Sequence, residues 1–98
     1  MSVYIVARIN IQDRDRYAQY EGEFMNIFSR FNGTMLAVDE APQVLEGDWP
    51  ATRTVLISFP NEADARAWYE SEAYQAIAQH RFAASEGDIA LLQGIPSA

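Results

Sequence analysis

The sequence contains no cysteine, and this absence removes three kinds of chemistry at once. The chain can form no disulfide, cannot use a thiolate as a nucleophile, and cannot build a cysteine-based metal site. Its single histidine, His80, would leave a zinc ion mostly to carboxylate ligands, which zinc disfavours. We therefore predict no metal site and no cofactor.

Basic residues are also scarce, with 7 Lys and Arg against 14 Asp and Glu, a net charge of −7 and a sequence pI near 4.4. Phosphate backbones and anionic lipid surfaces repel such a chain, so we predict neither a nucleic-acid nor a membrane partner. The five glycines are scattered and form no phosphate-binding loop.

Long apolar runs are missing as well. None approaches the roughly 20 residues that a membrane-spanning helix needs. The first residues lack the basic start and apolar core of a signal peptide. A cytoplasmic protein is the resulting expectation.

What the chain has is enough apolar material for one packed domain, 49% of its 98 residues. We predict a single domain over residues 1–98. A domain of this size buries only about two-thirds of its unfolded surface and is marginally stable alone. Dimerisation would compensate for that small core.

Hydrophobic periodicity predicts two strand–helix–strand units. Strands are expected at 3–10, 34–38, 53–59 and 88–95. Asp13 is predicted to cap the first helix, which ends at Asn32-Gly33. A second helix follows Asn61, breaks at Ser71 and ends near 85–87. Residues 39–51 form the one long irregular stretch, within which 43–45 are compatible with a strand extension.

The order β-α-β-β-α-β predicts an α+β, ferredoxin-like fold, in which a four-stranded antiparallel sheet carries its helices on one face. A monomer of this kind would need polar residues on the other face. The strands instead have apolar residues on both sides, such as Ile5 and Val6, or Ile57 and Leu56. Contiguous apolar surface of this kind marks an interface, so we predict a symmetric homodimer formed through the sheets.

Two segments carry a resemblance to a known family. Residues 41–50 (APQVLEGDWP) and 65–75 (ARAWYESEAYQ) are similar to the hallmark stretches of a widespread, mostly bacterial family of unknown function in the dimeric α/β-barrel superfamily. The opening residues 4–8, Arg81 and residues 87–94 also fit. The resemblance implies a ferredoxin-like protomer in a homodimer. It implies no activity, because the family itself is uncharacterised, and the superfamily is too diverse for analogy, since it includes cofactor-free monooxygenases, lactone isomerases and haem enzymes.

The candidate chemistry centres on Glu46, Asp48 and Arg81. Arg81 shares a helical stripe with Tyr74, Ile77 and Ala78, so its guanidinium should point toward the sheet. A buried guanidinium needs a carboxylate or an anionic ligand. One interpretation is a pocket in which Arg81 binds a substrate carboxylate or enolate and Glu46 or Asp48 acts as base. The other is an ion pair that holds the loop to the second helix.

Aromatic residues supply the remaining candidates for ligand binding. Trp49, Trp68, Tyr20 and Tyr69 could line a cavity, with Tyr20 preferred among the tyrosines because it is central in its helix. The alternative is that these rings only fill the core. His80 could be a general base or, by analogy with the superfamily, a haem ligand. Helical geometry turns it about 100° from Arg81, which favours a surface or partly buried histidine.

These observations predict a homodimer with a pocket between the sheet, the second helix and the 39–51 loop. The first hypothesis is a module that binds a small anionic organic ligand, with or without cofactor-free turnover of the isomerase or monooxygenase kind. The second is a non-catalytic dimerisation domain in which the same residues are structural.

Overall fold

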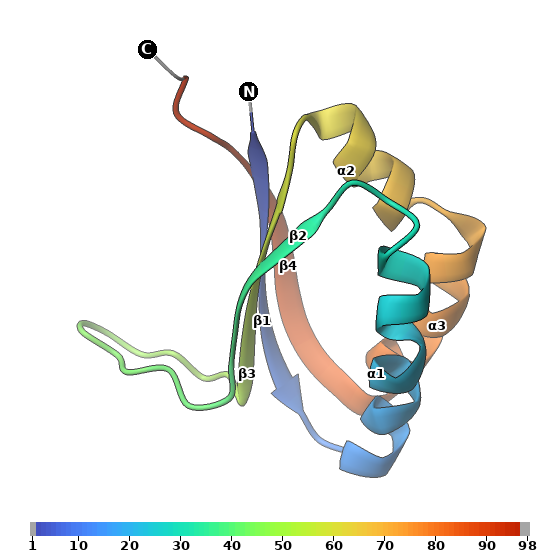
Figure 1. The fold of residues 1–98 in the computed structure, drawn as a ribbon. Helices are drawn as coiled ribbons and strands as arrows, with labels where there is room; N and C mark the ends of the chain where they lie inside the picture. Colours follow the sequence, from blue (N-terminus) through green and yellow to red (C-terminus); the bar gives the residue numbers. More distant parts are fainter. Residues whose placement is uncertain (1, 97–98) are drawn as a thin grey trace.

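The structure is a computed structural model that describes residues 2–96. Its elements run β1 (Val3–Ile11), α1 (Arg14–Phe28), β2 (Thr34–Asp39), β3 (Arg53–Phe59), α2 (Glu62–Tyr69), α3 (Glu72–Ala84) and β4 (Ser85–Gln93). The four strands form one antiparallel sheet in the order β2-β3-β1-β4, and all three helices cover the same face (Figure 1). The predicted α+β, ferredoxin-like fold is confirmed.

The two central strands explain why the core forms on one side. Every second residue of β1, from Val3 to Ile11, is buried under the helices. In β3 the buried positions are Val55, Ile57 and Phe59, and the register places Ile57 beside Ile5. This period of two matches the pleat of a strand, so one face of the sheet supplies the floor of the core.

The helix starts follow the predicted caps. The side chain of Asp13 accepts a hydrogen bond from the amide of Arg16, Asn61 from that of Asp64, and Ser71 from that of Tyr74. Each bond satisfies an amide that has no partner within its helix. Ser71 therefore divides the second helical region into α2 and α3, as predicted from the sequence.

The last strand starts and ends earlier than predicted. We expected residues 88–95, but β4 begins at Ser85, directly after the last residue of α3. The carbonyl of Ala84 accepts from the amides of Gln12 at 2.8 Å and Asp13 at 3.0 Å, which ties this junction to the end of β1. Gly87 then lies so close to β1 that a Cβ there would meet the carbonyl oxygen of Arg8 at 2.5 Å.

The segment 40–52, which we call the arm, extends from the sheet on the side away from the helices (Figure 1). Residues 43–45 form no strand, so the expected extension is absent. Gly47 adopts φ +79°, a conformation that suits glycine, within the arm. Leu45 is 94% exposed. Near the base of the arm, the indole N–H of Trp49 donates to Thr54 Oγ1 at 2.9 Å.

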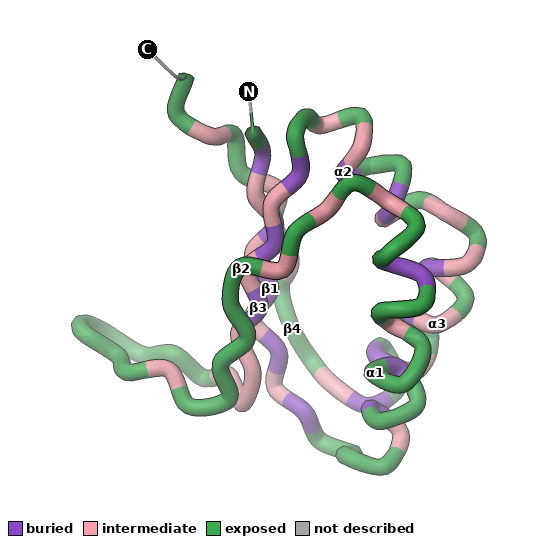
Figure 2. The backbone as a smooth tube through the Cα atoms, in the orientation of Figure 1, coloured by how far each residue is buried: buried purple, intermediate pink, exposed green. Residues whose placement is uncertain are grey.

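The helix-free face of the sheet is apolar at its centre. Val6 lies between Leu56 of β3 and Ala90 of β4, and Tyr4 lies beside Leu92. Buried and half-buried residues alternate along β1 (Figure 2), the half-buried ones lie on this face, and Leu92 of β4 is 48% exposed. Toward the arm the face becomes charged, with Arg8 paired to Asp88 at 3.1 Å. In residues 2–96 no helix is both long enough and apolar enough to cross a bilayer.

Candidate functional site

A cavity of about 350 Å³ lies between α1 and the covered face of the sheet. Its walls are largely apolar, because the inward residues of β1 and β3 form one side and the stripe of α1 forms the other. Residues from α2 and α3 close a further side. The lining includes Ile5, Ala7, Ile9, Val55 and Ile57 from the sheet, Tyr17, Tyr20 and Phe24 from α1, and Trp68 and Tyr74. Its size and lining are typical of a small-molecule site.

Two tyrosine hydroxyls meet at this cavity. Tyr20 of α1 and Tyr74 of α3 are buried, and their hydroxyl oxygens are 2.8 Å apart. We call them the tyrosine pair. The spacing of Tyr20 in the α1 stripe points its ring toward α3, and the rings cross edge to face with centroids 6.1 Å apart. Burial raises the pKa of Tyr20 well above its ordinary value, so Tyr20 keeps its proton at neutral pH. Burial likewise raises the pKa of Tyr17 to about 12.

Arg81 lies beside the tyrosine pair and is only 5% exposed. Its guanidinium carbon is 5.8 Å from the ring centre of Tyr20 and 4.7 Å from that of Phe82. Within the described residues no carboxylate lies within ion-pair distance of it, and its Nε has no hydrogen-bond partner. Burial lowers the pKa of Arg81, but attraction to Tyr74 and Tyr20 outweighs this and raises it overall. A buried cation without a carboxylate partner therefore lies beside the tyrosine pair, although Arg81 is not itself among the residues that line the cavity.

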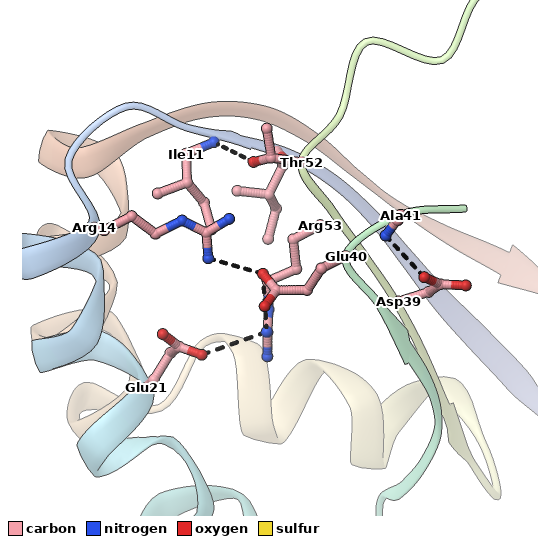
Figure 3. A network of polar contacts seen from close by, with 9 residues as sticks. Ile11, Arg14, Glu21, Asp39, Glu40, Ala41, Thr52 and Arg53 are labelled. Carbon is pink, nitrogen blue, oxygen red and sulfur yellow. Dashed lines mark hydrogen bonds and ion pairs between the residues drawn. The ribbon is translucent and has the colours of Figure 1, made fainter. Parts of the chain in front are cut away.

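Charged residues gather at the rim of the cavity, around the start of β3 (Figure 3). Arg53 Nη1 lies 3.3 Å from Glu21 of α1 and 3.8 Å from Glu40 of the arm, and Glu40 accepts from Arg14 at 2.8 Å. The hydrogen bond to Arg14 holds the pKa of Glu40 below its usual range. Both Arg53 and Glu21 line the cavity. The two cations and two carboxylates balance, so the rim carries no net charge.

Part of the predicted site is present in this protomer. Tyr20 and Trp68 line the cavity, and Arg81 is buried against Tyr20 as expected from its stripe. Tyr69 lines a separate hollow of about 210 Å³, beside Arg66 and Leu91. The indole N–H of Trp68 is buried and has no hydrogen-bond partner in the described part of the chain.

The three predicted site residues of the loop, Glu46, Asp48 and Trp49, do not line the cavity. Glu46 and Asp48 are exposed on the arm, and Trp49 packs under Arg8, whose guanidinium carbon lies 5.1 Å from its ring centre on the helix-free face. The predicted ion pair between Arg81 and Glu46 or Asp48 is therefore wrong for the protomer. The reason is direction: the arm leaves the sheet on the side opposite the helices (Figure 1). The pocket is therefore bounded by α1, and not by the 39–51 loop as predicted.

Sequence reasoning missed Arg53 and Glu21. The sequence did contain a signal for Arg53. It stands two residues before Val55, so the period of two along β3 places it on the same inward face of the strand. A charged residue at the inward end of a strand must reach the rim of the core or bind a partner. Glu21 carried no comparable signal, since it follows Tyr20 on a helix whose acidic residues are mostly exposed.

His80 has a structural contact. It is half-buried, and its Nδ1 accepts a hydrogen bond from Arg16 Nε at 2.8 Å. This agrees with the interpretation of a partly buried histidine and joins α3 to α1. Across residues 2–96, no group of three or more His, Cys, Asp or Glu side chains is arranged to hold a metal ion.

Comparison with known proteins identifies the family. A domain of unknown function, DUF1330, matches residues 2–95, so the chain belongs to that family. The predicted resemblance is confirmed. Among curated proteins, none is detectably similar in sequence.

Several solved structures share the fold. A protein of unknown function from Rhodopseudomonas palustris has a TM-score of 0.81 at 15% identity, over 98% of this chain and 84% of its own. A dimeric ferredoxin-like protein of unknown function from Jannaschia sp. CCS1 has a TM-score of 0.75 at 12% identity, and the match covers 96% of this chain and 100% of that protein. SnoaB, a cofactor-independent oxygenase from Streptomyces nogalater, has a TM-score of 0.70 at 11% identity, and the match covers 98% of this chain and 95% of SnoaB. At these identities the likeness establishes the fold alone.

The tyrosine pair gives a prediction about stability. Replacing Tyr20 by Phe should leave the Tyr74 hydroxyl buried without its partner, at a cost of about 1–3 kcal/mol in the free energy of unfolding. Tyr20→Phe combined with Tyr74→Phe should cost less than the two single changes together, since no orphaned hydroxyl remains. Urea denaturation measures this, with Tyr4→Phe on the helix-free face as the matched control. Strictly additive losses would argue against the pairing.

Proposed function

We propose that the protein is a homodimer in which each protomer binds a small, mostly apolar organic molecule that carries one acidic oxygen. The observation that carries this proposal is Arg81, a buried guanidinium without a carboxylate, beside a pair of hydroxyls that line an apolar cavity. A carboxylate or enolate of the ligand would supply the missing negative charge.

The energetics favour a ligand over an empty site. A buried cation without a counter-ion is costly, and so is a buried donor without an acceptor. One hydroxyl of the tyrosine pair donates to the other, so the second can donate to an anionic oxygen, while Arg81 behind Tyr20 lowers the energy of that negative charge. Aromatic walls would bind the rest of the molecule by excluding water.

A catalytic form of this proposal is a cofactor-free isomerase or monooxygenase, in which the same hydroxyls would stabilise an enolate. The fold shared with SnoaB is the only support for it from relatives. Within one protomer Glu21 is the carboxylate that lines the cavity. Glu46 and Asp48 could serve as base only if the arm of one protomer reached the cavity of the other.

The homodimer has support from two directions. The helix-free face is apolar at its centre, and a structural relative from Jannaschia sp. CCS1 is a dimeric ferredoxin-like protein. The arm lies on this same side, so a partner sheet packed there would also meet the exposed Leu45 (Figure 1). A non-catalytic dimerisation domain is the alternative function, and it would need no ligand.

Octanoate and 1-octanol test the ligand proposal, because they share a chain length and differ in the acidic oxygen. We expect octanoate to raise the melting temperature of the protein in a concentration-dependent way and 1-octanol to raise it less. Equal shifts for the two compounds would mean that the cavity recognises only apolar surface. No shift with either, together with an intact dimer, would favour the dimerisation domain.

A further inference from the structure

The rim of the cavity contains a second unsatisfied donor, Arg53 Nε. This atom is buried and has no hydrogen-bond partner in residues 2–96, although Nη1 of the same side chain contacts Glu21 at 3.3 Å. The Arg53 side chain is only 17% exposed and lines the cavity. Buried donors are nearly always paired, so this one indicates an acceptor that the protomer does not supply.

The position of Arg53 is fixed from several directions. The β3 register pairs it with Ile9 of β1, and its guanidinium carbon lies 5.9 Å from the ring centre of Tyr17. Glu21 and Glu40 hold the outer nitrogen, while Arg14 holds Glu40 (Figure 3). The side chain is thus oriented before any ligand arrives, which lowers the entropy cost of binding.

Charge decides which acceptor fits. Arg53 and Arg14 are already balanced by Glu21 and Glu40 at the rim, so a second anion there would face two carboxylates with no free cation. A neutral carbonyl oxygen can accept from Arg53 Nε without that repulsion. At the tyrosine pair the balance is reversed, because no carboxylate of residues 2–96 pairs with Arg81. The rim of the cavity therefore favours a neutral acceptor, and the end at the tyrosine pair favours an anionic oxygen.

We propose that the ligand is an oxo-acid type of molecule, with its acidic oxygen at the tyrosine pair and a neutral ketone, ester or amide carbonyl at Arg53. This inference rests on the proposed function, and it adds the chemical class of the ligand and its orientation. Arg53 is the residue that determines specificity at the outer end.

Three eight-carbon acids separate the possibilities: octanoate has no outer acceptor, 7-oxooctanoate has a neutral one, and octanedioate has an anionic one. Their affinities are measured by isothermal titration, with the six- and ten-carbon homologues covering other lengths. We expect 7-oxooctanoate, or its best-fitting homologue, to bind about five- to tenfold more tightly than the plain acid of that length. The diacid should bind at least about tenfold more weakly.

Two variants test whether residues at the rim cause these differences in affinity. Arg53→Lys keeps a positive charge near Glu21 but lacks the Nε–H, so it should still bind octanoate and lose the preference for the oxo-acid. Glu21→Gln removes one rim carboxylate and should narrow the gap between the diacid and octanoate. Circular dichroism and the melting temperature establish that each variant is folded.

The outcomes separate this inference from the proposed function. If octanoate binds and the oxo-acids gain nothing at any length, or if Arg53→Lys keeps their advantage, the assignment of Arg53 is wrong while the acid-binding site remains. Tightest binding of the diacid would also overturn it. If none of the acids binds the wild-type protein, both proposals fail.

Discussion

Replacing Arg81 by Met should leave the protein folded and remove its response to octanoate. Met has a similar length and no charge, and a buried charge without a carboxylate contributes little to stability. We expect the melting temperature of the free variant to stay the same or rise. At 100 times the dissociation constant, octanoate should stabilise the wild type by about 2.7 kcal/mol, and this gain should vanish in the variant.

Arg66→Met is the matched control for this change. Arg66 is exposed on α2 and, among residues 2–96, pairs with Glu62 and Glu70 of the same helical region, so its loss should spare the octanoate response. Thermal shift measures both variants across a range of octanoate concentrations. An Arg81→Met protein that still responds like the wild type would exclude Arg81 from ligand binding. Severe unfolding of this variant, with no ligand response in the wild type, would instead favour the structural interpretation.

Replacing Leu56 by Glu should convert the proposed homodimer to monomers. Leu56 is half-buried within the protomer and lies at the centre of the helix-free face, between Val6 and Ala37. A charge at this position would have to be buried against the partner sheet without a counter-ion, which costs several kcal/mol. Light scattering coupled to size exclusion should then report a particle of 11.0 kDa, the mass of one chain.

Ala67→Glu is the control for Leu56→Glu, because it adds the same charge on the exposed side of α2. It should remain dimeric. Circular dichroism should show that Leu56→Glu keeps its helices and strands, since the changed side chain points away from the core. A Leu56→Glu protein that runs as the wild-type dimer would place the interface elsewhere. A wild-type protein that is monomeric at micromolar concentration would rule out the homodimer.

The fold followed from the sequence because its signals were local and repeated. The alternation along β1 and β3, the caps at Asp13 and Ser71, and the order of the elements all indicated the same arrangement. The boundary between α3 and β4 was missed, because Ser85, Glu86 and Gly87 resemble a connecting loop. Their pairing with Ile11, Asn10 and Ile9 across the sheet outweighs that local preference.

The candidate site was less predictable, because it depends on direction in space. Burial of Arg81 followed from helical spacing, and so did the inward direction of Tyr20 and Trp68. The side of the sheet on which the arm would lie did not follow, since a loop of irregular backbone has no periodicity to fix it. The cavity also depends on how far α1 stands from the sheet, which no single residue determines.

The direct junction of α3 with β4 has a consequence for how a ligand could enter the cavity. Because Ala84 is hydrogen-bonded to Gln12 and Asp13 and no linker follows it, Tyr74 and Arg81 are carried on a helix that is fastened to the central strands. Two residues that line the cavity on the opposite side, Met25 of α1 and Val38 of the outermost strand β2, are exposed, so we expect a ligand to enter between these two elements.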